Sequence, residues 1–114
     1  MDNEKAARAA LAARSRGFCE RCGQPGPTDA AHRKARSQGG KWATSNLLHL
    51  CRDCHGHGHK HPAQAYADGR HLRSTQDPTT APVLIRRGSR TGWALLDDTG
   101  TIQWTTPPPE ATAC

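Results

Sequence analysis

The sequence predicts a small α+β fold held together by a metal site, and three observations support this prediction. Two CxxC pairs occur in the first half of the chain, at Cys19 and Cys22 and at Cys51 and Cys54. The 114 residues are only 34% hydrophobic and 4% aromatic, so they can form one modest domain but not a large apolar core. An alanine-rich segment opens the chain, and short segments rich in β-forming residues close it.

The two CxxC pairs have the spacing of zinc knuckles. Two residues between cysteines let both sulfur atoms face one tetrahedral ion, and two such pairs complete a closed site of four thiolates. Paired disulfides are the alternative, but the chain lacks the features of a secreted protein. A structural Zn2+ can supply folding free energy that a small core lacks. We therefore expect zinc at these four cysteines and expect Cys114, in the tail, to be dispensable.

The charge of the chain suits a polyanionic partner. The sequence has 16 Lys and Arg residues against 10 Asp and Glu residues, a formal net charge of +6, although many basic proteins bind no polyanion. It has no apolar run of about 18 residues that could span a membrane, and its first residues lack the apolar core of a signal peptide. We therefore expect a protein of the reducing cytoplasm without a membrane partner.

Residues 1–17 are predicted to form a basic N-terminal helix. Asp2 or Asn3 can cap a helix that runs to about Arg14, because the intervening alanines are strong helix formers, and Gly17 can end it. The charges of this helix do not form one clear stripe. We therefore favour a solvated helix that leans on the domain over a basic arm that follows a nucleic-acid backbone.

The core is predicted to span residues 18–73 and to contain two strands. We expect a short strand at about 30–33 and a second strand at 47–50, joined by a polar loop that contains Gly39 and Gly40. A helix should begin near the second cysteine pair, and a further short helix should follow it.

Glycine and proline residues limit both of these helices. Gly56 and Gly58 each cost the first helix about 1 kcal/mol relative to alanine, which weakens the prediction. Pro62 suits the first turn of the second helix, over 63–68, and Gly69 can end it.

Beyond a linker at 74–82, residues 83–106 are predicted to form a β-hairpin appendage. We expect strands at 83–87, 93–96 and 101–104, with a turn at 98–100 between the last two. Two strands alone are marginal in water, so the appendage must pack on the core or gain a third pairing, with Trp93 and Trp104 as its anchors. The proline-rich residues 107–114 are expected to be disordered.

The residues between and after the cysteine pairs resemble the HNH endonuclease family. The segments AHRKARSQGG and SNLLHLCRDCH carry His, Gly-Gly, Asn-Leu and CxxCH in the order of that family, over roughly residues 18–61. The CxxC pairs are similar to its zinc-stapled, phage-type branch. The resemblance implies a ββα-metal fold, in which two strands and a helix surround one catalytic divalent cation and the four-cysteine zinc is a separate support.

The same resemblance implies a function. It is that of a metal-dependent DNA endonuclease encoded by a phage or mobile element and acting in the host-cell cytoplasm. Phage packaging or replication proteins are further candidate partners. The catalytic cation would be Mg2+, Mn2+, Ni2+ or Zn2+.

Three residues match the roles that phosphodiester cleavage requires, which are a base, a cation ligand and a group that positions the base. By its place in the motif His32 resembles the general base, and imidazole titrates near neutral pH. Asn46 resembles the asparagine that fixes the loop and orients the base, although an ordinary turn asparagine fits as well. His55 resembles the terminal histidine that binds the cation.

His59 is a second candidate ligand of that cation. It lies four residues after His55, and this spacing puts two imidazoles on one helix face. His57 and His61 fall off that face, and we expect them to be bystanders.

Ala31 departs from the pattern of the family. A histidine or aspartate commonly precedes the base and binds the cation, whereas alanine has no donor atom, so the ion would bind more weakly or through extra water. Asp29 would face the same side of a strand and is a candidate substitute. The chain therefore uses another group, carries an inactivating change, or is a degenerate nuclease.

A non-catalytic, zinc-dependent nucleic-acid-binding module is the rival interpretation. Its zinc knuckles and basic surface would only grip the nucleic acid. Retention of His32, Asn46 and His55 favours the nuclease, and the missing donor at Ala31 favours the module. On either view the basic residues around the loop are candidate phosphate contacts, although a charge run is usually a solvated face. These residues are Arg33, Lys34, Arg36 and Lys41.

Overall fold

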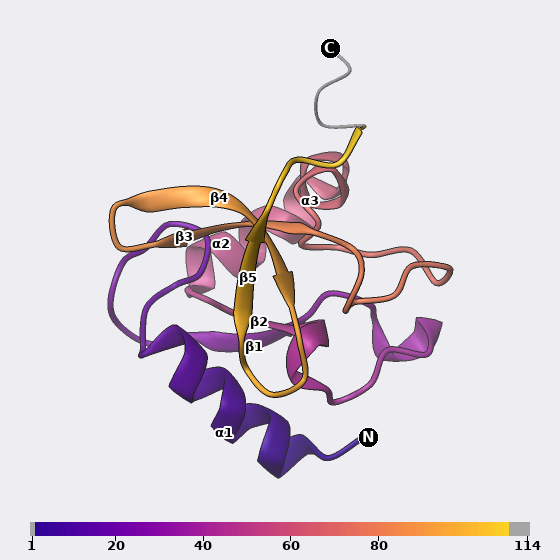
Figure 1. Ribbon diagram of the computed structural model, residues 1–114, viewed down its shortest axis with the longest axis horizontal. Coiled ribbons are helices and arrows are strands. Elements are labelled where there is room, and N and C mark those ends of the chain that lie inside the picture. Colours follow the sequence, from indigo (N-terminus) through magenta and orange to yellow (C-terminus); the bar gives the residue numbers. More distant parts are fainter. Residues whose placement is uncertain (1, 110–114) are drawn as a thin grey trace.

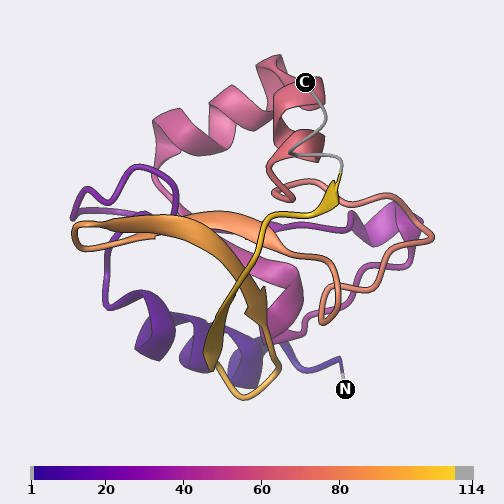
Figure 2. The same ribbon diagram turned by 45° about the horizontal axis from the view of Figure 1, so that its top comes forward.

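In the computed structural model, which describes residues 2–109, two antiparallel sheets separate an N-terminal helix from two later helices (Figure 1). The elements are α1 (Glu4–Ser15), β1 (Asp29–His32), the 3-10 helices η1 (Arg36–Gln38) and η2 (Thr44–Asn46), β2 (Leu47–Leu50), α2 (Arg52–Lys60), α3 (Pro62–Ala67), β3 (Val83–Arg87), β4 (Arg90–Leu96) and β5 (Ile102–Thr105). Figure 2 shows α1 on one side of the strands and α2 with α3 on the other. This mixture of helices and sheets confirms the predicted α+β class.

Helix α1 begins and ends as local sequence chemistry predicts. The Asn3 side chain accepts a hydrogen bond of 3.0 Å from the backbone N–H of Ala6, which caps the first turn. Arg16 and Gly17 both have positive φ angles, of 57° and 81°, and end the helix. Leu11 is fully buried against β2, so the helix packs on the domain through a narrow apolar stripe.

Strands β1 and β2 form an antiparallel pair that leads directly into α2. Ala31 pairs with Leu48 and His32 pairs with Leu47. Only Cys51 separates β2 from α2, and its sulfur accepts a hydrogen bond from the N–H of Cys54 in the first turn of that helix. The arrangement is the predicted ββα core, although β1 begins at Asp29, slightly earlier than expected.

The second sheet has three strands in the order β3, β4, β5, and it packs on the ββα core. Its buried residues Val83, Ile85, Ala94 and Leu96 share one apolar cluster with β1, β2 and two of the cysteines. The expected tryptophan anchors contribute less. Trp93 is partly exposed because it alternates with the buried Ala94, and Trp104, on the edge strand β5, is also only partly buried.

A buried ion pair joins α1 to the first zinc knuckle. Two guanidinium nitrogens of Arg14 donate to the two carboxylate oxygens of Glu20 over 2.9 and 2.8 Å, and both side chains are 1% exposed. The guanidinium also donates to the carbonyls of Thr44 and Leu47, and Glu20 accepts from the N–H of His49. The helix leans on the domain, as expected, and the buried Arg14 side chain is what binds α1 to β2.

Parts of two predictions end at the limits of the described chain. Within the predicted tail at 107–114, residues 110–114 lie outside the described residues, and Cys114 is among them. Across residues 2–109, none of the helices has the length and apolar character needed to cross a membrane.

Candidate metal centres and histidine groove

The four predicted zinc ligands come together in one cluster. The sulfur atoms of Cys19, Cys22, Cys51 and Cys54 all lie within 4.8 Å of one another. Among residues 2–109 this is the one group of three or more His, Cys, Asp or Glu ligands assembled closely enough to hold a metal ion. Four thiols at the distances of a tetrahedral site, closed to further ligands, fit a structural Zn2+.

The surroundings of the cluster favour the thiolate form of Cys19 and oppose that of Cys54. Burial works against ionisation of Cys19, but hydrogen bonds from the backbone of Cys22, Cys51 and Arg21 lower its pKa to about 7. Burial raises the pKa of Cys54 to about 12, although Arg21 donates to its sulfur over 3.6 Å. A divalent cation bound by all four sulfurs would favour their thiolate forms, which burial of Cys54 otherwise opposes.

A second feature is a groove of about 540 Å3 beside the cluster, between β1, the loop after it and α2. We call it the histidine groove, because four histidines are among its lining residues. These are His32, His55, His59 and His71.

His55, which lines this groove, is oriented by the carboxylate of Asp29. Its Nδ1 lies 3.0 Å from Oδ2 of Asp29, and Arg52 donates to both oxygens of the same carboxylate over 3.1 and 3.3 Å. The hydrogen bond with His55, and then that with Arg52, hold the pKa of Asp29 below its usual value despite some burial. A metal-binding histidine commonly uses one ring nitrogen for the metal and the other for a carboxylate. The pair leaves Nε2 of His55 for a cation.

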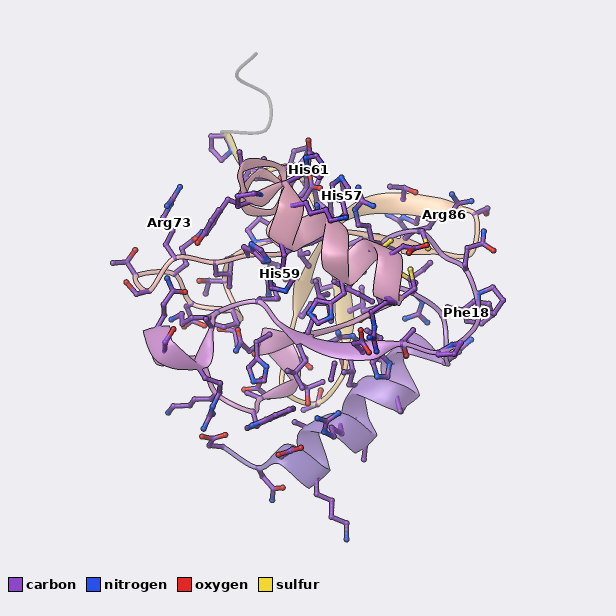
Figure 3. The ribbon with its side chains drawn as sticks, turned by 180° about the vertical axis from the view of Figure 1, so that it is seen from behind. Phe18, His57, His59, His61, Arg73 and Arg86 are labelled. Atoms are coloured by element: carbon purple, nitrogen blue, oxygen red, sulfur yellow. The ribbon has the colours of Figure 1, made fainter. Side chains whose placement is uncertain are left out.

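His59 lies beside His55, as the four-residue spacing predicts. Their ring centroids are 5.1 Å apart, and His59 is exposed at the groove. Figure 3 shows His59 directed toward the strands, whereas His57 and His61 lie along the opposite side of α2. These last two rings stack on each other with centroids 4.5 Å apart.

His71 is a groove residue that sequence reasoning missed. Its ring centroid lies 5.9 Å from that of His59, and burial followed by the charge of His59 lowers its pKa. Helix α3 folds back so that Ala65 accepts from the N–H of both Arg70 and His71, which brings this segment onto α2. Gly58 makes the contact possible, since a Cβ there would lie 3.3 Å from His71 Nε2. In the sequence, Gly58 is the one sign that another segment packs closely on α2, although a glycine in a helix equally indicates a weak helix.

His32 borders the same groove but contacts the α1 side of the domain. Its ring lies edge-on to Trp42 with centroids 4.4 Å apart, and its Nε2 is buried without a hydrogen-bond partner among residues 2–109. Burial, and then the positive charges of Arg36 and Arg8, hold the pKa of His32 below its usual value. The imidazole is therefore neutral at pH 7 and able to accept a proton.

Ala31 lies between the groove and the core. It is 7% exposed, lines the histidine groove and belongs to the apolar cluster that contains Cys54. It alternates along β1 with His32 and so shares the face of Asp29. A larger donor at this position would lie on the same side of β1 as His55.

Asn46 holds the loop that follows His32. Its side-chain oxygen accepts from the N–H of Lys34 over 2.8 Å, and its amide nitrogen donates to the carbonyls of Lys34 and Lys41 over 3.0 and 3.1 Å. The backbone of Asn46 also accepts from the N–H of Arg33, next to His32. Asn46 is 1% exposed, and these hydrogen bonds fix the loop that follows His32.

The basic residues of the loop differ in what they can reach. Arg33 is 2% exposed and donates to the carbonyls of Ser45, Gly69, Pro78 and Ala81. Its predicted contact with a phosphate is therefore wrong, because the guanidinium is buried and occupied. Arg36 is exposed and paired with Asp2, while Lys34 and Lys41 line a separate pocket of about 490 Å3 on the other flank of the loop.

One protein-family model matches the chain. Residues 19–61 match the family described as HNH endonuclease. Neither the curated proteins nor the solved structures contain a match. The matched segment includes both cysteine pairs, His32, Asn46 and His55, and it ends before His71 and the three-stranded sheet.

Proposed function

Because residues 19–61 match the HNH endonuclease family, we propose that the protein is a metal-dependent endonuclease that hydrolyses phosphodiester bonds in DNA. The observation that carries the proposal is the pairing of Asp29 with His55 at the wall of a groove that His32 also borders. A binding module would not need a carboxylate that orients a histidine. A phage or mobile-element origin, phage packaging or replication proteins as partners, and a place in the host-cell cytoplasm belong to the same proposal.

In this proposal three residues that line the groove, and two that support them, each have a separate task. His55 and His59 bind a divalent cation, which would neutralise the phosphate and the leaving oxygen. Asp29 orients His55 by accepting from its Nδ1. His32 takes a proton from the attacking water at Nδ1, because its Nε2 is covered. Asn46 positions His32 by fixing the loop that follows it.

Ala31 determines how active this chain is expected to be. It contributes no donor atom, so two imidazoles alone would hold the cation, and water or phosphate oxygens would complete its shell. We expect feeble or undetectable nicking of plasmid DNA with Mg2+, Mn2+ or Ni2+, and a clear gain in Ala31→His. Ala31→Asp is the smaller second variant, since the position is 7% exposed and a histidine must displace core contacts.

Two further variants test the roles in the restored protein. His32→Ala should lower the nicking rate by about 10²- to 10⁴-fold, the usual contribution of a general base. His55→Ala should abolish nicking, because the cation that would neutralise the charge of the phosphate loses a ligand. His61→Ala is the matched control, since this exposed histidine stacks on His57 outside the groove and should keep full activity.

A cation-binding measurement tests the carboxylate directly. Asp29→Asn should weaken Mn2+ binding to the zinc-loaded protein by about 10- to 100-fold, the usual effect of removing such a partner. Isothermal titration calorimetry measures this without any cleavage. Asp53→Asn is the control. Asp53 lies in the first turn of α2, the helix that carries His55, and its replacement should leave the affinity unchanged. Equal affinities for all three proteins would contradict the role of Asp29.

The second candidate function is a zinc-dependent nucleic-acid-binding module. The absence of a donor at Ala31 favours it, as does the fact that, among residues 2–109, only the cysteines gather three potential ligands. It becomes the better explanation if Ala31→His and Ala31→Asp both bind zinc and DNA but cut nothing with any of the three cations.

A further inference from the structure

The arginines of the described chain differ in whether a carboxylate neutralises them. Five have a carboxylate oxygen within 4.0 Å, namely Arg8, Arg14, Arg36, Arg52 and Arg70. Among residues 2–109 no such pair involves Arg16, Arg87 or Arg90, although these three lie close together at the end of α1 and on the β3–β4 hairpin. Three guanidinium groups without a carboxylate partner are therefore neighbours at this place.

Two of the three arginines line a shallow pocket of about 340 Å3, and the third, Arg90, lies over the ring of Trp104 in its wall. Arg16 and Arg87 line it together with Ile102 and Trp104. Arg87 and Arg90 are register partners across the hairpin and so project from the same face of the sheet. We call Arg16, Arg87, Arg90 and Trp104 the arginine pocket.

Two contacts hold these side chains in place before any ligand binds. The Arg87 guanidinium donates to the carbonyl of Arg14 over 2.6 Å, and the Arg90 guanidinium lies 4.0 Å from the centre of the Trp104 ring. Gly92 leaves room for this ring, since a Cβ there would lie 3.3 Å from it. A guanidinium has five N–H donors, so one carbonyl leaves others for a ligand. Side chains ordered in advance lose less entropy on binding.

The nearby acidic residues do not cancel this charge. Strands β3 and β4 contain no Asp or Glu. In the turn between β4 and β5, Asp97 accepts from the N–H groups of Thr99 and Thr101, and Asp98 accepts from Ser45. Both carboxylates are therefore engaged in the turn.

We propose that the arginine pocket binds a backbone phosphate of DNA, as a second contact apart from the histidine groove. This inference rests on the proposed function in taking DNA as the partner. Arginine suits phosphate because its planar N–H groups match the phosphate oxygens. The residues of the pocket lie outside the family match, at the end of α1 and on the three-stranded sheet, whereas the histidine groove is lined from β1 and α2. Figure 2 shows α1 on one side of the strands and α2 on the other. A DNA segment held there is outside the one that enters the groove.

The test is the affinity of zinc-loaded protein for a fluorescent duplex, measured by anisotropy without added divalent cation at several salt concentrations. Arg87→Gln/Arg90→Gln should bind at least 10-fold more weakly at low salt. The slope of log affinity against log salt should become shallower by about 0.9, the contribution of one phosphate contact. Arg87→Lys/Arg90→Lys, which keeps the charge and perturbs folding less, should retain the wild-type salt slope.

Arg86→Gln is the matched control. Arg86 is exposed and adjacent in sequence, but it projects from the opposite face of β3, toward Gly23 of the first knuckle (Figure 3). It should retain most of the affinity. An equal loss in Arg86→Gln, an unchanged salt slope in the double glutamine variant, or no binding by the wild type at low salt would each overturn the proposal. If DNA is bound in this way but is not cut even by Ala31→His and Ala31→Asp with any of the three cations, the nuclease proposal alone is overturned.

Discussion

Replacing Cys54 by serine is expected to unfold the core of the protein. Cys54 is 5% exposed and links the sulfur cluster to the apolar cluster that both sheets share. Zinc contributes about 10 to 16 kcal/mol of apparent binding free energy in small zinc-dependent peptides, whereas whole domains are stable by only about 5 to 15 kcal/mol. Zinc binding therefore supplies an amount comparable to the entire stability, and Cys54→Ser removes one of the four thiolates on which that binding depends.

Metal analysis and circular dichroism measure this outcome. The wild-type protein should contain close to one tightly held zinc per chain and melt cooperatively, while Cys54→Ser and Cys22→Ser should lose both properties. Cys114→Ser makes the same chemical change outside the predicted zinc site and should behave as the wild type. A well-folded, zinc-free wild-type protein would contradict the four-cysteine assignment.

Local sequence patterns were sufficient for the features that depend on near neighbours. The CxxC spacing identified all four members of the sulfur cluster, and β2 and β3 have the bounds that their apolar patterns predicted. The four-residue spacing also placed His59 beside His55. Each of these features follows from chain geometry over a few residues.

Features that depend on distant segments could not be predicted in this way. His71 joins the groove only because α3 folds back onto α2, and no spacing rule connects it with His59. The burial of Arg14 and Arg33 is another such feature, since arginine is seldom fully buried. Their partners are carbonyls and a carboxylate from separate elements, which a linear pattern does not display.

For Asp29 the sequence predicts the face of the strand but not what the carboxylate contacts. Alternation along β1 predicted that Asp29 would share a face with Ala31, and hence that it could replace the missing ligand. In the structure its Oδ2 faces Nδ1 of His55 and its carboxylate also accepts from Arg52. Orientation of a ligand therefore explains Asp29 better than direct binding of the cation.

Glu20→Ala is expected to cost about 3 to 5 kcal/mol in the free energy of unfolding, the usual effect of leaving one member of a buried ion pair without its partner. The guanidinium of Arg14 would stay buried, 1% exposed, with carbonyls as its remaining partners. The N–H of His49 would lose its acceptor as well. Urea denaturation followed by tryptophan fluorescence measures the change.

Two variants separate this effect from a general loss of charge. Glu4→Ala breaks the exposed pair with Arg8, whose side chains are 53% and 51% exposed, and should cost at most about 1 kcal/mol. Arg14→Met/Glu20→Leu removes both buried charges and should recover much of the stability, because apolar side chains of similar volume carry no desolvation cost. If Glu20→Ala cost no more than Glu4→Ala, the pair would not be what binds α1 to β2.

The guanidinium of Arg14 also binds the carbonyl of Thr44 in η2, the element that ends in Asn46. Loss of the ion pair should therefore also disturb the loop after His32, which Asn46 holds.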